Sequence, residues 1–101
     1  MGTLHLVNRS PADSRALEHC LARAGQGDAV LLLEDAVYGA VAGAGSETVF
    51  RAAGRVALYV LGPDLEARGL EASAVANGIA TVDYRGFVAL TAAHAPIQSW
   101  F

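Results

Sequence analysis

The sequence contains no lysine, and its positive charge comes from seven arginines spread along a chain of net charge −3. Proteins that hold nucleic acid draw most of their affinity from clustered cations, which displace counterions from the phosphates. The arginines form no cluster and no stripe: Arg9, Arg15, Arg23, Arg51, Arg55, Arg68 and Arg85. We therefore expect no direct binding of RNA or DNA.

Cysteine and long apolar runs are also scarce. The single cysteine, Cys20, rules out a disulfide within the chain. The longest strongly apolar run, residues 29–33, is far shorter than the roughly 20 residues that cross a bilayer. The N-terminus lacks a charged segment followed by a long apolar one. We expect a soluble protein that stays in the reducing cytoplasm.

The usual motifs of metal and cofactor sites are missing as well. The three histidines, His5, His19 and His94, are far apart, and a structural zinc site needs about four ligands. Gly43-Ala44-Gly45 lacks the third glycine of a dinucleotide-binding loop and does not follow a strand. We expect no metal and no cofactor. A Ser-His-Asp triad stays open, although no nucleophile-elbow motif is present.

Apolar residues, by contrast, are abundant. They make up 53% of the 101 residues, and charged residues make up only 17%. A chain of this length folds as one domain, here residues 1–101, with a modest core. An excess of apolar surface on so small a domain suggests a subunit interface. Two candidates are the tail with Trp100 and Phe101 and the helix face of Val37, Tyr38 and Val41, although both also suit the domain core.

Short apolar runs alternate with helical patterns along the whole chain. Uninterrupted runs predict buried strands at 4–7, 29–33, 56–61 and 79–82. The segments between them predict helices from residue 13 or 14 to 24, and over 36–42, 46–53 and 86–94. Gly62-Pro63-Asp64 predicts a turn into a further helix that continues to about residue 68. A helical turn and loop is predicted at 71–78, and residues 97–101 form an apolar tail. This alternation is typical of an α/β domain with a parallel sheet.

Three aspartates occupy equivalent places in this pattern. Asp35, Asp64 and Asp83 each follow a strand and precede a helix, and Asn8 and Ser10 follow the first strand. Ligands of parallel α/β sheets bind at this carboxyl edge. The favoured interpretation is that each aspartate caps a helix N-terminus. An acidic edge also disfavours a phosphate-bearing ligand such as a nucleotide or flavin.

Cys20 is the one side chain with clear nucleophilic potential. It shares a helical stripe with Leu17, Leu21 and Ala24, which predicts apolar surroundings. A thiol is reactive only where a cation, a metal or a helix N-terminus lowers its pKa, and mid-helix supplies none of these. These grounds favour a buried structural role over a reactive thiol.

Several segments together resemble the DsrH/TusB family of sulfur-relay subunits. They follow one another in the family's order and cover nearly the whole chain. The segments are LHLVNRSP at 4–11, ALEHCL at 16–21, GDAVLLLED at 27–35, LYVLGPDLEARG at 58–69, VDYRGFV at 82–88 and QSWF at 98–101.

The resemblance implies a single-domain, three-layer DsrE-like α/β fold, with a mainly parallel sheet of four to five strands flanked by helices. It also implies a heterohexamer with DsrE/TusD-like and DsrF/TusC-like subunits. In this picture the DsrE/TusD-like partner carries the main persulfide cysteine. Sulfur then passes to a DsrC/TusE-like carrier protein, for 2-thiolation of tRNA wobble uridine or for cytoplasmic sulfur oxidation.

The resemblance makes Cys20 a candidate persulfide thiol, because it matches a cysteine typical of the sulfur-oxidation branch. Three hypotheses follow. The leading one is an accessory subunit that completes a sulfurtransferase complex and does not catalyse alone. The second makes Cys20 a sulfur-relay site of its own. The third is a flavodoxin-like module that binds a small molecule or nucleotide without sulfur chemistry.

Overall fold

The computed structural model describes residues 2–45, 50–51, 54 and 56–101. Most of the helix expected over 46–53 lies outside the described residues, although Phe50 and Arg51 are helical.

Five parallel strands form one sheet in the order β4-β3-β2-β1-β5. Their bounds are β1 Leu4–Val7, β2 Ala29–Leu32, β3 Ala57–Leu61, β4 Ile79–Val82 and β5 Ile97–Trp100. The four apolar runs become strands as predicted, and β2 is buried along its whole length. The apolar tail is the fifth strand, which pairs with β1 from Leu4↔Ile97 to Val7↔Trp100. The α/β fold with a parallel sheet is therefore confirmed.

Helical segments follow most of the strands. They are α1 Ala16–Arg23, the 3-10 helix η1 Glu34–Ala40, α3 Gly62–Ala67, the short 3-10 helix η2 Ala72–Ala74 and α4 Tyr84–Ala93. Helix α1 begins later than predicted because Ser10 and Ser14 hold the preceding residues in turns. The Ser10 carbonyl accepts hydrogen bonds from the amides of Asp13 and Ser14, and Ser14 Oγ accepts one from the amide of Ala16. The helical segment expected over 36–42 is a 3-10 helix that begins two residues earlier, at Glu34.

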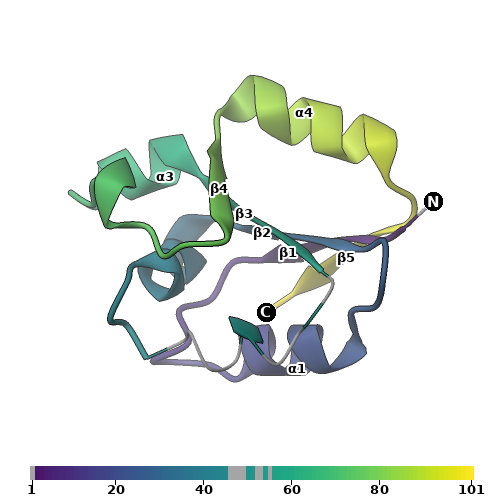
Figure 1. The fold of residues 1–101 in the computed structure, drawn as a ribbon, viewed down its shortest axis with the longest axis horizontal. Helices are drawn as coiled ribbons and strands as arrows, with labels where there is room; N and C mark the ends of the chain where they lie inside the picture. The colour runs from purple at the N-terminus through teal and green to yellow at the C-terminus, as the bar shows by residue number, and fades with distance from the viewer. Residues whose placement is uncertain (1, 46–49, 52–53, 55) are drawn as a thin grey trace.

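The sheet lies between two helical layers, with α4 over one face and α1 over the other (Figure 1). Below it, Cys20 and Leu17 of α1 pack with Val7, Val30 and Leu32. Above it, Leu90 and Phe87 of α4 pack with a second group of strand residues: Leu4, Ala29, Leu31 and Leu61. Because α4 joins β4 to β5, the two edge strands, it crosses over the sheet from one side to the other.

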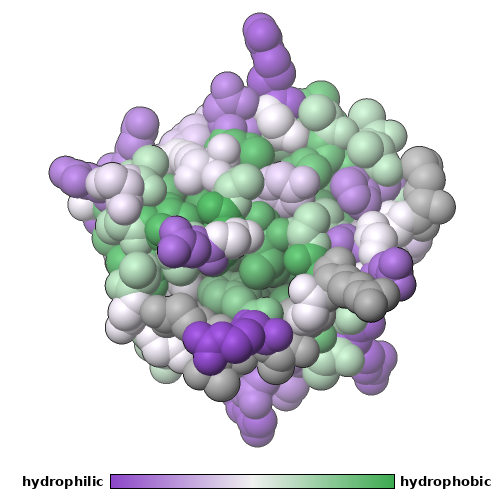
Figure 2. Space-filling model, in the orientation of Figure 1, coloured by the Kyte–Doolittle hydropathy of each residue, from purple (hydrophilic) through white to green (hydrophobic). Residues whose placement is uncertain are grey.

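Part of the apolar composition stays on the surface. Figure 2 shows hydrophobic residues gathered in the middle of one face, with hydrophilic ones projecting from the rim. The large hydrophobic side chains that are exposed are Tyr38, Tyr84, Val88, Ile97 and Phe101. Val37 is fully buried and Trp100 is partly buried, so both candidate interface segments divide between core and surface.

None of the helices in the described ranges is long and apolar enough to pass through a membrane.

Candidate functional site

Cys20 lies in the middle of α1 and is completely buried. The sequence prediction that it sits on the buried stripe of this helix is confirmed. Burial raises the pKa of its thiol to about 12, and the negative charge of Asp28 adds to the shift. Only roughly one thiol in a hundred thousand would therefore be ionised at neutral pH, and the thiolate is the nucleophilic form. In this fold Cys20 is a core side chain.

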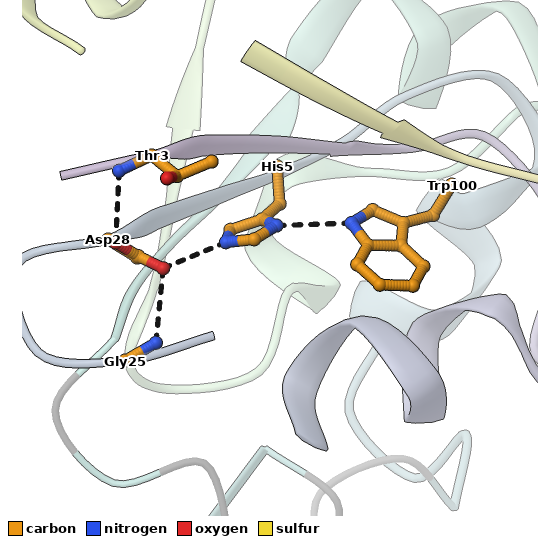
Figure 3. Close-up of polar contacts among 5 residues, drawn as sticks. All are labelled: Thr3, His5, Gly25, Asp28 and Trp100. Atoms are coloured by element: carbon orange, nitrogen blue, oxygen red, sulfur yellow. Dashed lines mark hydrogen bonds and ion pairs between the residues drawn. The ribbon is translucent and has the colours of Figure 1, made fainter. Parts of the chain in front are cut away.

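A polar network of His5, Asp28 and Trp100, which the sequence did not predict, lies on the α1 side of the sheet (Figure 3). His5, on β1, contacts Asp28 through Nε2 at 2.8 Å from Oδ2, and its Nδ1 lies 3.1 Å from Trp100 Nε1. In the sheet, His5 pairs with Val30 and Trp100 pairs with Val7. Paired residues direct their side chains to the same face of a sheet. Because Val30 and Val7 pack with α1, His5 and Trp100 also point to the α1 side. The network thus connects β1, the residue before β2 and the edge strand β5.

The protonation state of His5 follows from its two partners. An indole N–H can only donate a hydrogen bond, so His5 Nδ1 must accept it and carries no proton. Nε2 then carries the proton and donates to the Asp28 carboxylate. His5 is only 5% exposed, so this arrangement pairs both ring nitrogens of a buried polar group.

Asp28 is fixed by the turn between α1 and β2. Its carboxylate accepts hydrogen bonds from the amides of Thr3 at 2.9 Å and Gly25 at 3.1 Å, as well as from His5. Gly27, with φ of 88°, lets the chain turn back tightly enough to place it there. Burial alone raises the pKa of Asp28, but the hydrogen bonds from His5, Gly25 and Thr3 outweigh it and hold that pKa below its ordinary value.

A second group of polar residues lies at the carboxyl edge of the sheet. Asp83 caps α4 as predicted, because its Oδ1 accepts from the Gly86 amide at 2.8 Å. The capping prediction is wrong for Asp64 and Asp35. Helix α3 begins at Gly62 directly after β3, and η1 begins at Glu34, so both aspartates fall inside the first turn instead of before it.

These two aspartates connect neighbouring loops. Asp64 Oδ2 accepts from the Glu34 amide at 2.6 Å, and Arg68 forms an ion pair with Asp35 Oδ1 at 2.9 Å. Glu34 has φ of 50°, which a residue with a side chain rarely adopts. These contacts therefore hold the segment after β2 against the segment after β3. Asn8 Oδ1, near the end of β1, is shielded and has no hydrogen-bond partner in the described residues.

The same edge contains an open hollow of about 320 Å³ beside the end of β1. Its polar lining comes from Ser10, Ser14, Arg15, Glu18 and Tyr38. Arg15 is the one cation among the lining residues, and its Nε lies 3.0 Å from Glu18 Oε2, so its charge is already balanced. The ordinary chemistry for holding a phosphate is a free cation or bare backbone amides. This hollow offers no free cation among the residues that line it.

The remaining candidates stay separate. His19 is exposed on α1 and His94 follows α4, where its Nδ1 contacts the Leu90 carbonyl at 2.8 Å. Across the described parts of the chain, no three His, Cys, Asp or Glu side chains gather in a way that could hold a metal ion. The structure therefore brings together His5 with Asp28, and Arg68 with Asp35 and the main-chain carbonyl of Asp64. It does not join these groups to Cys20 as reactive partners.

Comparison with known proteins identifies the family. A family model described as DsrH like protein matches residues 9–97. Protein TusB of Pectobacterium parmentieri is 40% identical over 98 residues, which cover 96% of this chain and 99% of that one. Protein TusB of Shigella sonnei is also 40% identical, over 99 residues with the same coverage.

The fold agrees with this assignment. The crystal structure of the ychN protein from Escherichia coli superposes with a TM-score of 0.75 and covers 98% of this chain and 99% of its own, at 14% sequence identity. At that identity the likeness establishes the DsrE-like fold alone. The family match and the TusB relatives, each spanning most of the sequence, show that this chain belongs to the DsrH family.

Proposed function

We propose that this chain is an accessory subunit of a cytoplasmic sulfur-relay complex. Membership of the DsrH family supports the relay. The burial of Cys20 supports the accessory role, because a thiol with a pKa of about 12 and no exposed surface is neither ionised nor reachable by a sulfur donor. The sulfur-carrying cysteine then belongs to a DsrE/TusD-like partner.

The proposed task of this subunit is to complete the assembly around the partner's cysteine. A DsrF/TusC-like subunit would complete the heterohexamer, and a DsrC/TusE-like protein would receive the sulfur. The exposed apolar side chains Tyr84 and Val88 on α4 and Phe101 at the C-terminus support an assembled state. Burying apolar surface contributes roughly 25 cal/mol per Å², so such residues favour association.

Two steps test this function. Co-expression with DsrE/TusD-like and DsrF/TusC-like subunits is expected to yield one complex that contains all three chains. In cells that lack their own TusB, that complex is expected to restore 2-thiouridine in tRNA if it serves the tRNA branch. Should the tRNA remain unmodified, sulfite formation from sulfane sulfur tests the oxidation branch. A chain that never co-purifies with these subunits would contradict the proposal.

A binding module for a small molecule or nucleotide is the second candidate, and the hollow at the end of β1 is the observation that favours it. The ion pair between Arg15 and Glu18 argues against an anionic ligand there. Calorimetric titration with nucleotides and flavins separates the two candidates. Saturable binding at this hollow, abolished by a Tyr38→Ala substitution, would favour the binding module.

A further inference from the structure

Strand β5 is a short edge strand of four residues that follows Pro96 and has no charged side chain. It pairs with β1 on one side, and no described residue pairs with its other side. Natural edge strands avoid contact with other strands by means of charged residues, prolines or bulges. The four residues of β5, Ile-Gln-Ser-Trp, include none of these, and Ile97, Gln98 and Ser99 are exposed.

The backbone geometry fixes which groups of β5 are available. The Leu4 amide donates to the Pro96 carbonyl, and β1 and β5 pair in the register Leu4↔Ile97. In a parallel ladder, residues 98 and 100 then direct their N–H and C=O groups toward β1. The corresponding groups of Ile97 and Ser99 point outward, where another strand can bind them.

The side chains on the same edge favour one particular register. Ile97 is 48% exposed and Phe101, one residue beyond the strand, is 79% exposed. If an identical strand runs antiparallel about an axis at Ser99, then Ser99 lies opposite Ser99 and Ile97 lies opposite Phe101. The two exposed apolar side chains would thus cover each other. Such cross-strand apolar pairs are a main source of stability in sheets.

We propose that β5 pairs antiparallel with β5 of a second copy of this chain, about a two-fold axis at Ser99. One strand supplies both members of every pair in this arrangement, as a symmetric interface requires. None of the side chains paired in this register, at residues 97, 99 and 101, is charged, although each copy carries a net charge of −3. The opposite edge, β4, is less suitable because its exposed residues, Ala80 and Thr81, offer little apolar surface.

The network of His5, Asp28 and Trp100 fixes one end of β5 in place. Trp100 is held by His5, which is in turn held by Asp28, so the end of the strand is fixed before a partner arrives. A strand fixed in its bound conformation loses less conformational entropy on association. The proposal is independent of sulfur transfer, since it needs only β5 and its supporting residues.

Charge substitution at the axis tests the pairing. In the full-length protein, Ser99→Lys or Ser99→Glu places like charges directly opposite each other, so each variant is expected to raise the dimer dissociation constant by at least about tenfold. An equimolar mixture of the two variants places opposite charges together and is expected to restore dimers. Analytical ultracentrifugation measures all three samples beside the wild-type protein.

Ala80→Lys on the other edge strand is the matched control, and it is expected to leave the dimer unchanged. A wild-type protein that is monomeric at every accessible concentration would overturn the proposal. A dimer that tolerates Ser99→Lys, or a mixture that fails to recover, would place the interface elsewhere and would overturn it too. The outcome does not depend on whether the sulfur-relay function holds.

A covalent probe supplies an independent readout. Hydrogen-bonded antiparallel pairs have Cα atoms about 5.5 Å apart, which lies within the range of a disulfide. Ser99→Cys is therefore expected to form a disulfide-linked dimer under mild oxidation with copper phenanthroline, whereas Ala80→Cys is expected to form no disulfide between copies. Equal cross-linking of the two variants would show random collisions and contradict the proposed pairing.

Discussion

At the scale of single residues, the environment of Cys20 decides its chemistry. The stripe of apolar residues on α1 predicts burial, and the structure adds the cause of its low reactivity. Burial and the nearby Asp28 both disfavour the thiolate, and together they raise the pKa to about 12. A thiol in this position contributes packing in the core and little nucleophilicity.

The raised pKa makes stability depend on pH in the alkaline range. The thiol stays protonated in the folded protein up to about pH 12, whereas in the unfolded chain it ionises near pH 9. The unfolded state therefore loses its proton first, and folding stability falls as the pH rises from 9 to 12, by up to about 1.4 kcal/mol per pH unit.

Urea unfolding at several pH values, for the wild type and for Cys20→Ala, measures this effect. The variant is expected to be less stable at pH 7 by about 1 kcal/mol because of the lost sulfur. Its stability is also expected to fall less steeply above pH 9. Parallel slopes for the two proteins would show that the thiol is not held in its neutral form by the fold.

The His5 network is the second feature at this scale. Trp100→Phe removes the indole N–H and leaves His5 Nδ1 buried without a donor. We expect a loss of about 1–3 kcal/mol in unfolding free energy. Amide hydrogens of β1 that bond to β5 should also exchange faster with solvent, because the edge strand loses its anchor.

A double-mutant cycle separates this bond from the loss of ring size. His5→Phe removes the acceptor, so the double variant His5→Phe/Trp100→Phe should be more stable than the sum of the two single effects predicts. Strictly additive effects would mean that the contact contributes nothing beyond packing.

At the scale of helices and strands, apolar runs were sufficient to predict four strands and the order of the elements. They were insufficient for details that depend on neighbours far along the chain. Asp64 resembles a cap in the sequence, but α3 starts two residues before it, and its carboxylate binds Glu34 instead. His5 and Trp100 are 95 residues apart, and only the pairing of β1 with β5 brings them together.

Signals for the network were nevertheless present in the sequence. His5 interrupts the apolar run of β1, a polar residue at a position expected to be buried. Asp28 directly precedes β2, and Trp100 lies near the C-terminus. Because buried polar groups are almost always hydrogen-bonded, His5 alone indicated that a partner must exist. The identity of that partner depends on the pairing of β1 with β5, which the sequence did not reveal.

The junction of β4 and α4 yields a prediction at this scale. A Cβ at Gly86 would lie 2.8 Å from Val82 Cβ, closer than two side chains tolerate. Gly86→Ala is therefore expected to destabilise the protein by about 1–3 kcal/mol, although alanine is intrinsically the better helix former.

The control is Val82→Gly, which removes the Cβ that the new methyl group would meet. In its background Gly86→Ala should cost less than in the wild type, and thermal unfolding of the four proteins measures the difference. If Gly86→Ala stabilised the wild type, the close approach of α4 to β4 would be contradicted.

At the scale of the whole molecule, the chain combines a small, well-packed sheet domain with apolar residues that it does not cover. Its one thiol lies inside, and its sheet has an edge strand with no charged side chain. Both features are typical of a subunit that acts within an assembly. We therefore propose that the sulfur chemistry belongs to a partner and that this chain gives structural support.

Mass spectrometry of the assembled complex tests this central claim most directly. The complex of this chain with its DsrE/TusD-like and DsrF/TusC-like partners is loaded with sulfane sulfur, and each cysteine peptide is then mapped for the addition of one sulfur atom. We expect the added sulfur on the partner's cysteine and none on Cys20. A complex that carries Cys20→Ala is expected to load the partner's cysteine equally. Added sulfur on Cys20, removed when the DsrC/TusE-like carrier is supplied, would contradict this claim.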